Sequence, residues 1–186
     1  MVVAPQTYRF TAEEYYRMGE VGILPPDVRV ELVGGEIKRM PPIYPPHASI
    51  VDRLNSALSR LPAGLAIVRV QNPIRLDDFN EPQPDVTVLR YRGDYYGNQH
   101  PTPADVLLTI EVADTSLRYD RDEKMPLYGR AGIPEAWLID VQAQTVTVFT
   151  EPHADGYGQE RVVTRGQEIV SLAVEGLRLQ VDEALG

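Results

Sequence analysis

The chain of 186 residues contains no cysteine and only three histidines. Without cysteine it can form no disulfide and no thiolate metal site, and it cannot use a cysteine nucleophile. The histidines are scattered along the sequence, so a zinc cluster is not expected. The lack of disulfides fits an intracellular protein, and we expect a cytoplasmic location.

Long apolar runs are also absent. No segment approaches the roughly 18 consecutive apolar residues that span a bilayer. The first residues, M-V-V-A-P-Q-T-Y, have neither the basic nor the apolar part of a signal peptide. We therefore expect no membrane partner. At 43% hydrophobic and 24% charged residues the composition is that of a soluble globular protein, and the length predicts one domain over residues 1–186.

Positive charge is scarce, because the formal net charge is −9. This acidity argues against a non-specific nucleic-acid binder, whose affinity depends on Lys and Arg contacts with phosphates. It argues less against an enzyme that holds a short substrate through a metal ion. Any contact with DNA would need a local basic patch, for which the candidates are Arg90, Arg92, Arg118, Arg121 and Lys124.

Helical and strand patterns alternate along the chain, which predicts an α/β or α+β fold with one layered sheet and helices against it. Thr11 and Glu14 form a capping-box pattern that opens a short helix. A hairpin is predicted over 28–40 around the Gly34-Gly35 turn. Further helices are predicted over 47–61 and 120–130, and strands over 65–70, 73–76, 85–89, 105–112, 135–140 and 145–150.

Two acids stand at the ends of predicted apolar strands, where sheets commonly bind ligands: Asp85 and Glu111. If these strands are neighbours, both carboxylates can reach one Mg²⁺, with the backbone carbonyl of Val112 as a further oxygen ligand. Lys124 is one of only two lysines among 18 basic residues, and a compact ammonium ion can steady a phosphate or a water. Two carboxylates and a lysine are the minimum set for metal-assisted phosphodiester cleavage.

Each residue also has a purely structural interpretation. An acid at a strand end is more often a solvated terminus, and Lys124 could form a surface i,i+4 pair with Asp120. Asp120 followed by Glu123 fits a capping box, and we favour the helix N-cap interpretation for Asp120. Glu31, on a half-exposed strand, would ordinarily belong to the polar exterior.

The order of the motifs carries more information than any one of them. It runs from V-E-L-V-G-G-E around Glu31, through His47 at a helix start and P-D-V-T-V at Asp85, to the block from Glu111 to Asp140. That block reads I-E-V-A-D-T-S, then D-x-x-x-K, then A-G-I-P-E-A-W-L-I-D. This order resembles the Uma2 (DUF820) family, a bacterial branch of the PD-(D/E)xK restriction-endonuclease-like superfamily.

The resemblance implies a restriction-endonuclease-like mixed β-sheet flanked by helices, and a Mg²⁺-dependent endonuclease acting on DNA, with Mn²⁺ as a substitute ion. It implies that Asp85 and Glu111 are metal ligands and that Lys124 is the catalytic lysine, displaced onto the helix. Glu31 matches an upstream acid that completes the metal shell or orients water. His47 matches a recurrent histidine, an accessory residue whose role does not follow from the sequence. By analogy a homodimer is expected.

Two departures from the family pattern leave alternatives open. Residues 113–116 read A-D-T-S where a Ser-Pro-Ser-like stretch is usual. Pro126 lacks a backbone donor and predicts that Met125 leaves helical geometry, which would turn Lys124 away from the acids. One alternative is therefore a catalytically inactive binding or assembly module of the same fold. Another is an RNA or nucleotide phosphodiesterase, because nothing in the sequence selects DNA over RNA.

Overall fold

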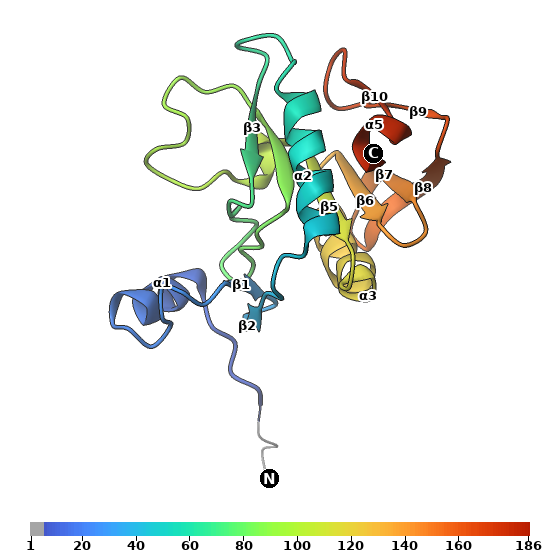
Figure 1. Ribbon diagram of the computed structural model, residues 1–186. Coiled ribbons are helices and arrows are strands. Elements are labelled where there is room, and N and C mark those ends of the chain that lie inside the picture. Colours follow the sequence, from blue (N-terminus) through green and yellow to red (C-terminus); the bar gives the residue numbers. More distant parts are fainter. Residues whose placement is uncertain (1–5) are drawn as a thin grey trace.

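A six-stranded mixed sheet forms the centre of the computed structural model, which describes residues 6–186 (Figure 1). Every neighbouring pair of strands is antiparallel except β5 and β6, which run parallel. The predicted mixed sheet is confirmed. In spatial order its strands are β3 (Ala66–Val70), β4 (Val86–Arg90), β5 (Val106–Ala113), β6 (Glu135–Asp140), β7 (Thr145–His153) and β8 (Gly156–Thr164).

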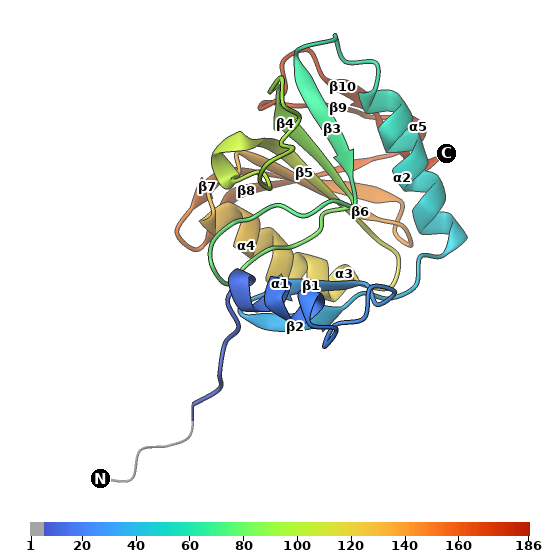
Figure 2. The same cartoon turned by 90° about the vertical axis from the view of Figure 1, so that its left-hand side faces the viewer.

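Helices cover both faces of the sheet (Figure 2). On one face lie α2 (Pro45–Leu58) and α5 (Val181–Leu185), whose apolar side chains join Val86, Ile110 and Trp137 in the larger core cluster. On the other lie α3 (Leu117–Tyr119), the π-helical turn η2 (Asp120–Lys124) and α4 (Met125–Arg130). Met125 and Tyr128 pack there with Ala113 and Leu138.

The smaller elements lie around this centre. The hairpin β1 (Val30–Val33) and β2 (Glu36–Arg39) lies beside α1 (Ala12–Glu20) in both ribbon views. The capping box predicted at the start of α1 is confirmed. The remaining elements are the 3₁₀ turn η1 (Pro103–Asp105) and the hairpin of β9 (Glu168–Val170) and β10 (Arg178–Gln180). None of the helices in the described part of the chain has the length and apolarity to cross a bilayer.

The strand predicted over 73–76 is wrong. The backbone N–H groups of Ile74 and Arg75 donate to the carbonyls of Pro82 and Pro101, which lie in loops and not in a neighbouring strand. An apolar run beside a proline therefore packs into the core here without joining a ladder.

The helix predicted over 120–130 begins earlier, at Leu117, and this corrects two expectations. Asp120 lies inside the helical segment at φ −63°, ψ −44°, so the N-cap interpretation is wrong. Met125 keeps helical geometry at φ −59°, ψ −49° in spite of the following Pro126. In a regular helix the proline ring would clash with the carbonyl four residues earlier. The wider η2 turn, which ends two residues before Pro126, accommodates the ring and lets the helix continue.

Candidate active site

A buried ion cluster forms around the ammonium group of Lys124. Its Nζ lies 2.9 Å from Oε1 of Glu111 and 3.4 Å from Oε2 of Glu31, and all three side chains are almost completely buried. The Glu31 carboxylate also accepts hydrogen bonds from the Tyr119 hydroxyl at 3.0 Å and the Gln83 backbone N–H at 2.9 Å. The lysine therefore points at the acids, in contrast to the displacement that Pro126 predicted.

Asp85 is the centre of a second set of contacts. Its Oδ2 accepts a hydrogen bond from the Val112 backbone N–H at 2.9 Å and lies 3.0 Å from Nε2 of His47. Its Oδ1 accepts from Nε2 of Gln71 at 3.2 Å. The bond to Val112 fixes the Asp85 carboxylate beside the strand position that follows Glu111.

Local geometry explains how these side chains reach one place. Successive side chains of a strand point to opposite faces, so Glu111 shares its face with Ala113, which packs against α4. Val112 points to the opposite face, into the core with α2. The small Ala113 leaves room beside Glu111, and the helix that follows β5 brings Lys124 back to that space.

Burial and mutual charge shift the ionisation of the lysine cluster. Burial raises the pKa of Glu111 to about 8; the positive charge of Lys124 opposes this, and the nearby Asp120 and Asp85 add to it. Burial alone lowers the pKa of Lys124, but the negative charges of Glu111, Glu31 and Asp120 outweigh it and raise the pKa well above its ordinary value. Lys124 therefore stays an ammonium ion.

The contact of Asp85 with His47 shifts both pKa values toward the charged forms. Burial raises the pKa of Asp85, but the hydrogen bond and charge of His47 outweigh it, so the pKa falls below its ordinary value. For His47, burial lowers the pKa, and the Asp85 contact outweighs this and raises it. Nδ1 of His47 is buried without a hydrogen-bond partner in the described part of the chain.

A fourth carboxylate, the buried Asp120, belongs to the same region. It accepts a hydrogen bond from the Ser116 hydroxyl. Burial raises the pKa of Asp120, while Lys124 and Ser116 oppose this rise. The sequence offered the signal D-x-x-x-K, which places Asp120 one helical turn before Lys124, but the pattern also fits an N-cap.

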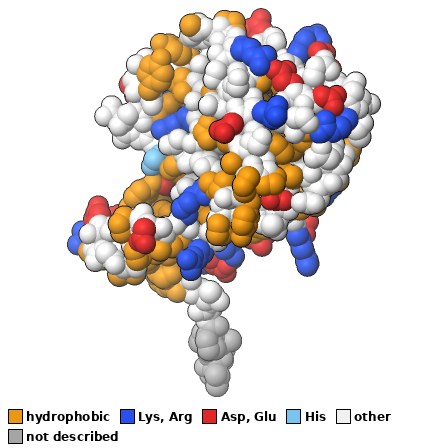
Figure 3. Space-filling view, in the orientation of Figure 1, with side chains coloured by type: hydrophobic (Ala, Val, Ile, Leu, Met, Phe, Trp, Pro, Cys, Tyr) orange, Lys and Arg blue, Asp and Glu red, His pale blue; other side chains and the backbone are white. Residues whose placement is uncertain are grey.

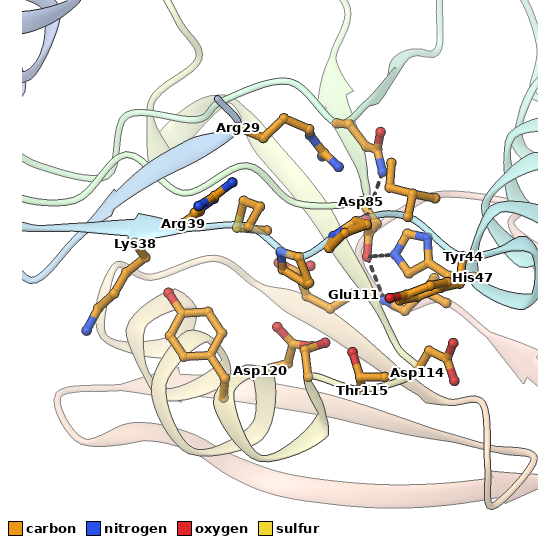
Figure 4. Close-up of a pocket in the computed structure, with 18 of the residues that line it drawn as sticks. Arg29, Lys38, Arg39, Tyr44, His47, Asp85, Glu111, Asp114, Thr115 and Asp120 are labelled. Carbon is orange, nitrogen blue, oxygen red and sulfur yellow. Dashed lines mark hydrogen bonds and ion pairs between the residues drawn. The ribbon is translucent and has the colours of Figure 1, made fainter. Parts of the chain in front are cut away.

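These groups line a cavity of about 450 Å³. Figure 4 shows Asp85 and Glu111 in its middle, Asp114 and Asp120 along one side, and Arg29 and Arg39 reaching in from the hairpin side. Glu31 lies behind Lys124 and does not line the cavity, whereas the remaining predicted residues do. Predicted site residues that line the cavity are His47, Asp85, Glu111, Val112 and Lys124.

Four of the five basic residues predicted as a DNA-contact patch lie outside the cavity. Arg92 pairs with Asp94, Arg118 with Asp122, Arg121 with Glu160, and Arg90 donates to the backbone carbonyl of Ala104, and none of these arginines lines the cavity. Other basic residues line it: Arg29, Lys38 and Arg39. Their sequence signal is weak, because an isolated arginine beside a hairpin strand usually lies on a solvated surface.

The residues at the cavity wall fit a divalent metal ion whose remaining ligands are water and substrate phosphates. Within residues 6–186 no group of three or more His, Cys, Asp or Glu side chains is arranged to hold a metal by itself. Mg²⁺ does not require such a group, since proteins usually bind it through one or two carboxylates together with water and substrate phosphates. Asp85 and Glu111 supply two hard oxygen donors at one cavity wall.

Comparisons with known proteins agree with this fold. A crystal structure described as "a putative nuclease belonging to DUF820", from Anabaena variabilis ATCC 29413, superposes with a TM-score of 0.71. It is 20% identical in sequence, and the match covers 95% of this chain and 97% of that chain. The chain therefore shares the fold of that protein.

The family follows from the sequence match. The model of the Uma2 family, described as "Putative restriction endonuclease", matches residues 12–182, so the chain belongs to the Uma2 family. This confirms the resemblance. No curated protein matches the chain.

Proposed function

We propose that the chain is a Mg²⁺-dependent endonuclease that hydrolyses DNA phosphodiester bonds. The observation that carries the proposal is the meeting of Asp85, Glu111 and Lys124 at the wall of one cavity. Asp85 and Glu111 would hold the ion, with the backbone carbonyl of Val112 as a further ligand and Mn²⁺ as a substitute ion. When bound, Mg²⁺ supplies polarisation of the scissile phosphate and a lower pKa for an attacking water.

The side chains of the chain itself have distinct roles in this proposal. Lys124 places a fixed positive charge where negative charge builds on the phosphate. Glu31 holds that ammonium group from behind, with Tyr119 and Gln83 fixing its own carboxylate. His47 orients Asp85 and keeps its carboxylate ionised.

The test is cleavage of supercoiled and linear DNA with Mg²⁺ or Mn²⁺ by three variants. We expect Asp85→Asn and Glu111→Gln to lose at least about a hundredfold in rate while remaining folded, as for other groups that stabilise transition-state charge. Glu135→Gln is the matched buried control, because that carboxylate is fully buried in β6 and its partners include Trp137, Ser171 and backbone N–H groups far from the cavity. Wild-type rates in both Asp85→Asn and Glu111→Gln would refute the proposal.

A non-catalytic binding or assembly module is the second candidate. Two observations favour it. Lys124 already forms ion pairs with Glu111 and Glu31, and the net charge of the chain is −9. Titration with Mg²⁺ or Mn²⁺ separates the two candidates. An endonuclease should bind the metal ion and lose that binding in Asp85→Asn. A non-catalytic module should show no metal binding that depends on Asp85.

Three further expectations belong to the proposal. RNA offered beside DNA in the same cleavage assay tests the RNA or nucleotide phosphodiesterase alternative. A homodimer would allow two sites to address two strands, and sedimentation velocity measures it. The expected compartment is the cytoplasm, which fractionation of cells expressing the chain would test.

A further inference from the structure

Six consecutive exposed residues, the first four of which line the cavity, lie between β2 and the first turn of α2. We call this segment, Pro41-Pro42-Ile43-Tyr44-Pro45-Pro46, the proline strap (residues 41–46). Exposed apolar side chains on a soluble protein normally occur singly, and a run of this length is unfavourable unless it has a function. Figure 3 shows hydrophobic side chains gathered between the hairpin and the start of α2, with Lys and Arg side chains beside them.

The strap has a fixed shape. Four of its six residues are prolines, whose rings lock the backbone torsion φ, so the strap loses little conformational entropy when a ligand packs on it. Pro41, Pro42, Ile43 and Tyr44 line the same cavity as the carboxylates. The cavity thus has one acidic wall and one apolar wall.

Two arginines stand beside the apolar wall. Arg29 and Arg39 line the cavity, and among residues 6–186 no carboxylate forms a salt bridge with either guanidinium. Arg29 lies close enough to His47 for its charge to oppose protonation of that histidine. Lys38 differs, because Glu36 holds its ammonium at 2.5 Å. The two guanidinium groups are therefore free to bind an anion, and their planar fork suits a phosphate.

The combination matches one kind of ligand. An unpaired nucleotide offers a flat apolar base that stacks on aromatic and proline rings, and a phosphate that pairs with arginine. In a continuous duplex the base faces are stacked on one another and are not available to the strap. The volume of about 450 Å³ lies in the range of small-molecule sites and has room for a single nucleotide.

Resting on the proposed function, we infer that the proline strap with Arg29 and Arg39 binds an unpaired nucleotide, and that the preferred substrate is single-stranded nucleic acid or a frayed duplex end. A second copy of the chain is a poorer occupant. A symmetric contact through the strap would bring two sets of unpaired arginines toward each other.

Binding without cleavage tests the inference, by fluorescence anisotropy in EDTA with a labelled oligothymidylate and a labelled hairpin duplex. We expect tighter binding of the single strand. Tyr44→Ala should weaken it about tenfold, equivalent to about 1.4 kcal/mol and within the range for one base–aromatic stack. Tyr91→Ala is the matched control, because Tyr91 is 46% exposed against 51% for Tyr44 and lies outside the cavity. Its affinity should equal that of the wild type.

Salt dependence tests the arginines separately. Arg39→Gln should reduce the slope of log affinity against log salt by about 0.7, the value for one phosphate contact with a single strand. Arg161→Gln, an exposed arginine on β8 outside the cavity, should leave the slope unchanged. Measuring the affinity for oligouridylate in the same assay shows whether the site prefers ribose or deoxyribose. The inference is supported if oligothymidylate or oligouridylate binds in a way that depends on the proline strap. It is overturned if neither oligonucleotide binds.

The outcomes separate this inference from the proposed function. If the duplex binds as tightly as the single strand, or Tyr44→Ala behaves like Tyr91→Ala, the inference is overturned even when cleavage depends on Asp85. If Asp85→Asn cleaves normally while Tyr44→Ala loses single-strand binding, the proposed function fails and the inference stands. If Tyr44→Ala instead converts a dimer into a monomer in sedimentation velocity, the strap is a contact between copies and the inference is overturned.

Discussion

Replacing Lys124 with methionine tests whether the ammonium group holds the acidic cluster together. Methionine is apolar and unbranched, so it fills much of the same space without the charge. Glu111 and Glu31 would then remain as buried carboxylates that have lost their cation at 2.9 Å and 3.4 Å. Removing one partner of a buried ion pair costs about 3–5 kcal/mol, because it leaves an uncompensated buried charge. We expect the free energy of unfolding to fall by that amount.

The assay is urea denaturation in EDTA, so that no divalent cation replaces the ammonium group. Lys38→Met is the matched control, since Lys38 is the other lysine of the chain and its side chain is 32% exposed. Its ion pair with Glu36 lies at the surface and should contribute less than about 1 kcal/mol. Adding Glu111→Gln to Lys124→Met should recover part of the loss, because it removes one of the two buried acids that have lost the ammonium group. If Lys124→Met is as stable as Lys38→Met, the ammonium does not hold this cluster together.

Two further substitutions, one of them with a control, test the packing and the electrostatics around the site. Gly129→Ala should destabilise the protein by about 1–3 kcal/mol, because a Cβ there would overlap backbone atoms of Gly156 at the start of β8. Gly19→Ala, with nothing within 4 Å of the added Cβ, should be neutral or stabilising in thermal denaturation. His47→Gln should cost most stability between about pH 4 and pH 6.5 in EDTA. The raised pKa of His47 contributes stability that is lost as the pH rises through it, and the lowered pKa of Asp85 contributes stability that is lost as the pH falls through it. A difference between His47→Gln and wild type that is constant from pH 4 to pH 9 would contradict this account.

Local sequence patterns were sufficient to predict the secondary-structure elements that carry the acidic site residues. The continuous apolar run before Glu111 predicted a central strand, and β5 lies between β4 and β6. An acid inside such a run is costly to bury without a partner, so its presence was itself a signal of a site. The capping box at Thr11 and the hairpin at Gly34 were equally local, and both are confirmed.

Tertiary packing decided what the sequence did not predict. Glu31 reads as exterior from its strand alone, but Tyr119 and Gln83 cover it from segments far away in the chain. The orientation of Lys124 depends on the η2 turn, which forms because Pro126 must be accommodated within a helix that packs on the sheet. Arg29 and Arg39 reach the cavity only because the hairpin docks there, which no periodicity in the sequence reveals.

The charges around Lys124 do not balance, and this imbalance leads to a last prediction. Four buried or nearly buried carboxylates, Glu31, Asp85, Glu111 and Asp120, face two cationic groups, Lys124 and His47. Burial raises the pKa of Glu111 to about 8, so at neutral pH this acid must lose its proton before it binds a metal ion. With all four carboxylates ionised, four negative and two positive charges leave an excess of −2, which one divalent cation would cancel.

Under the proposed function Lys124 competes with that cation for the Glu111 carboxylate. Lys124→Met should therefore bind Mg²⁺ more tightly than the wild type in isothermal titration calorimetry, although it loses cleavage. Lys38→Met should raise the Mg²⁺ affinity less than Lys124→Met does, because Lys38 lines the cavity but its ammonium pairs with Glu36 and not with the buried acids. Equal or weaker binding by Lys124→Met would mean that the metal does not use the carboxylate that the lysine holds.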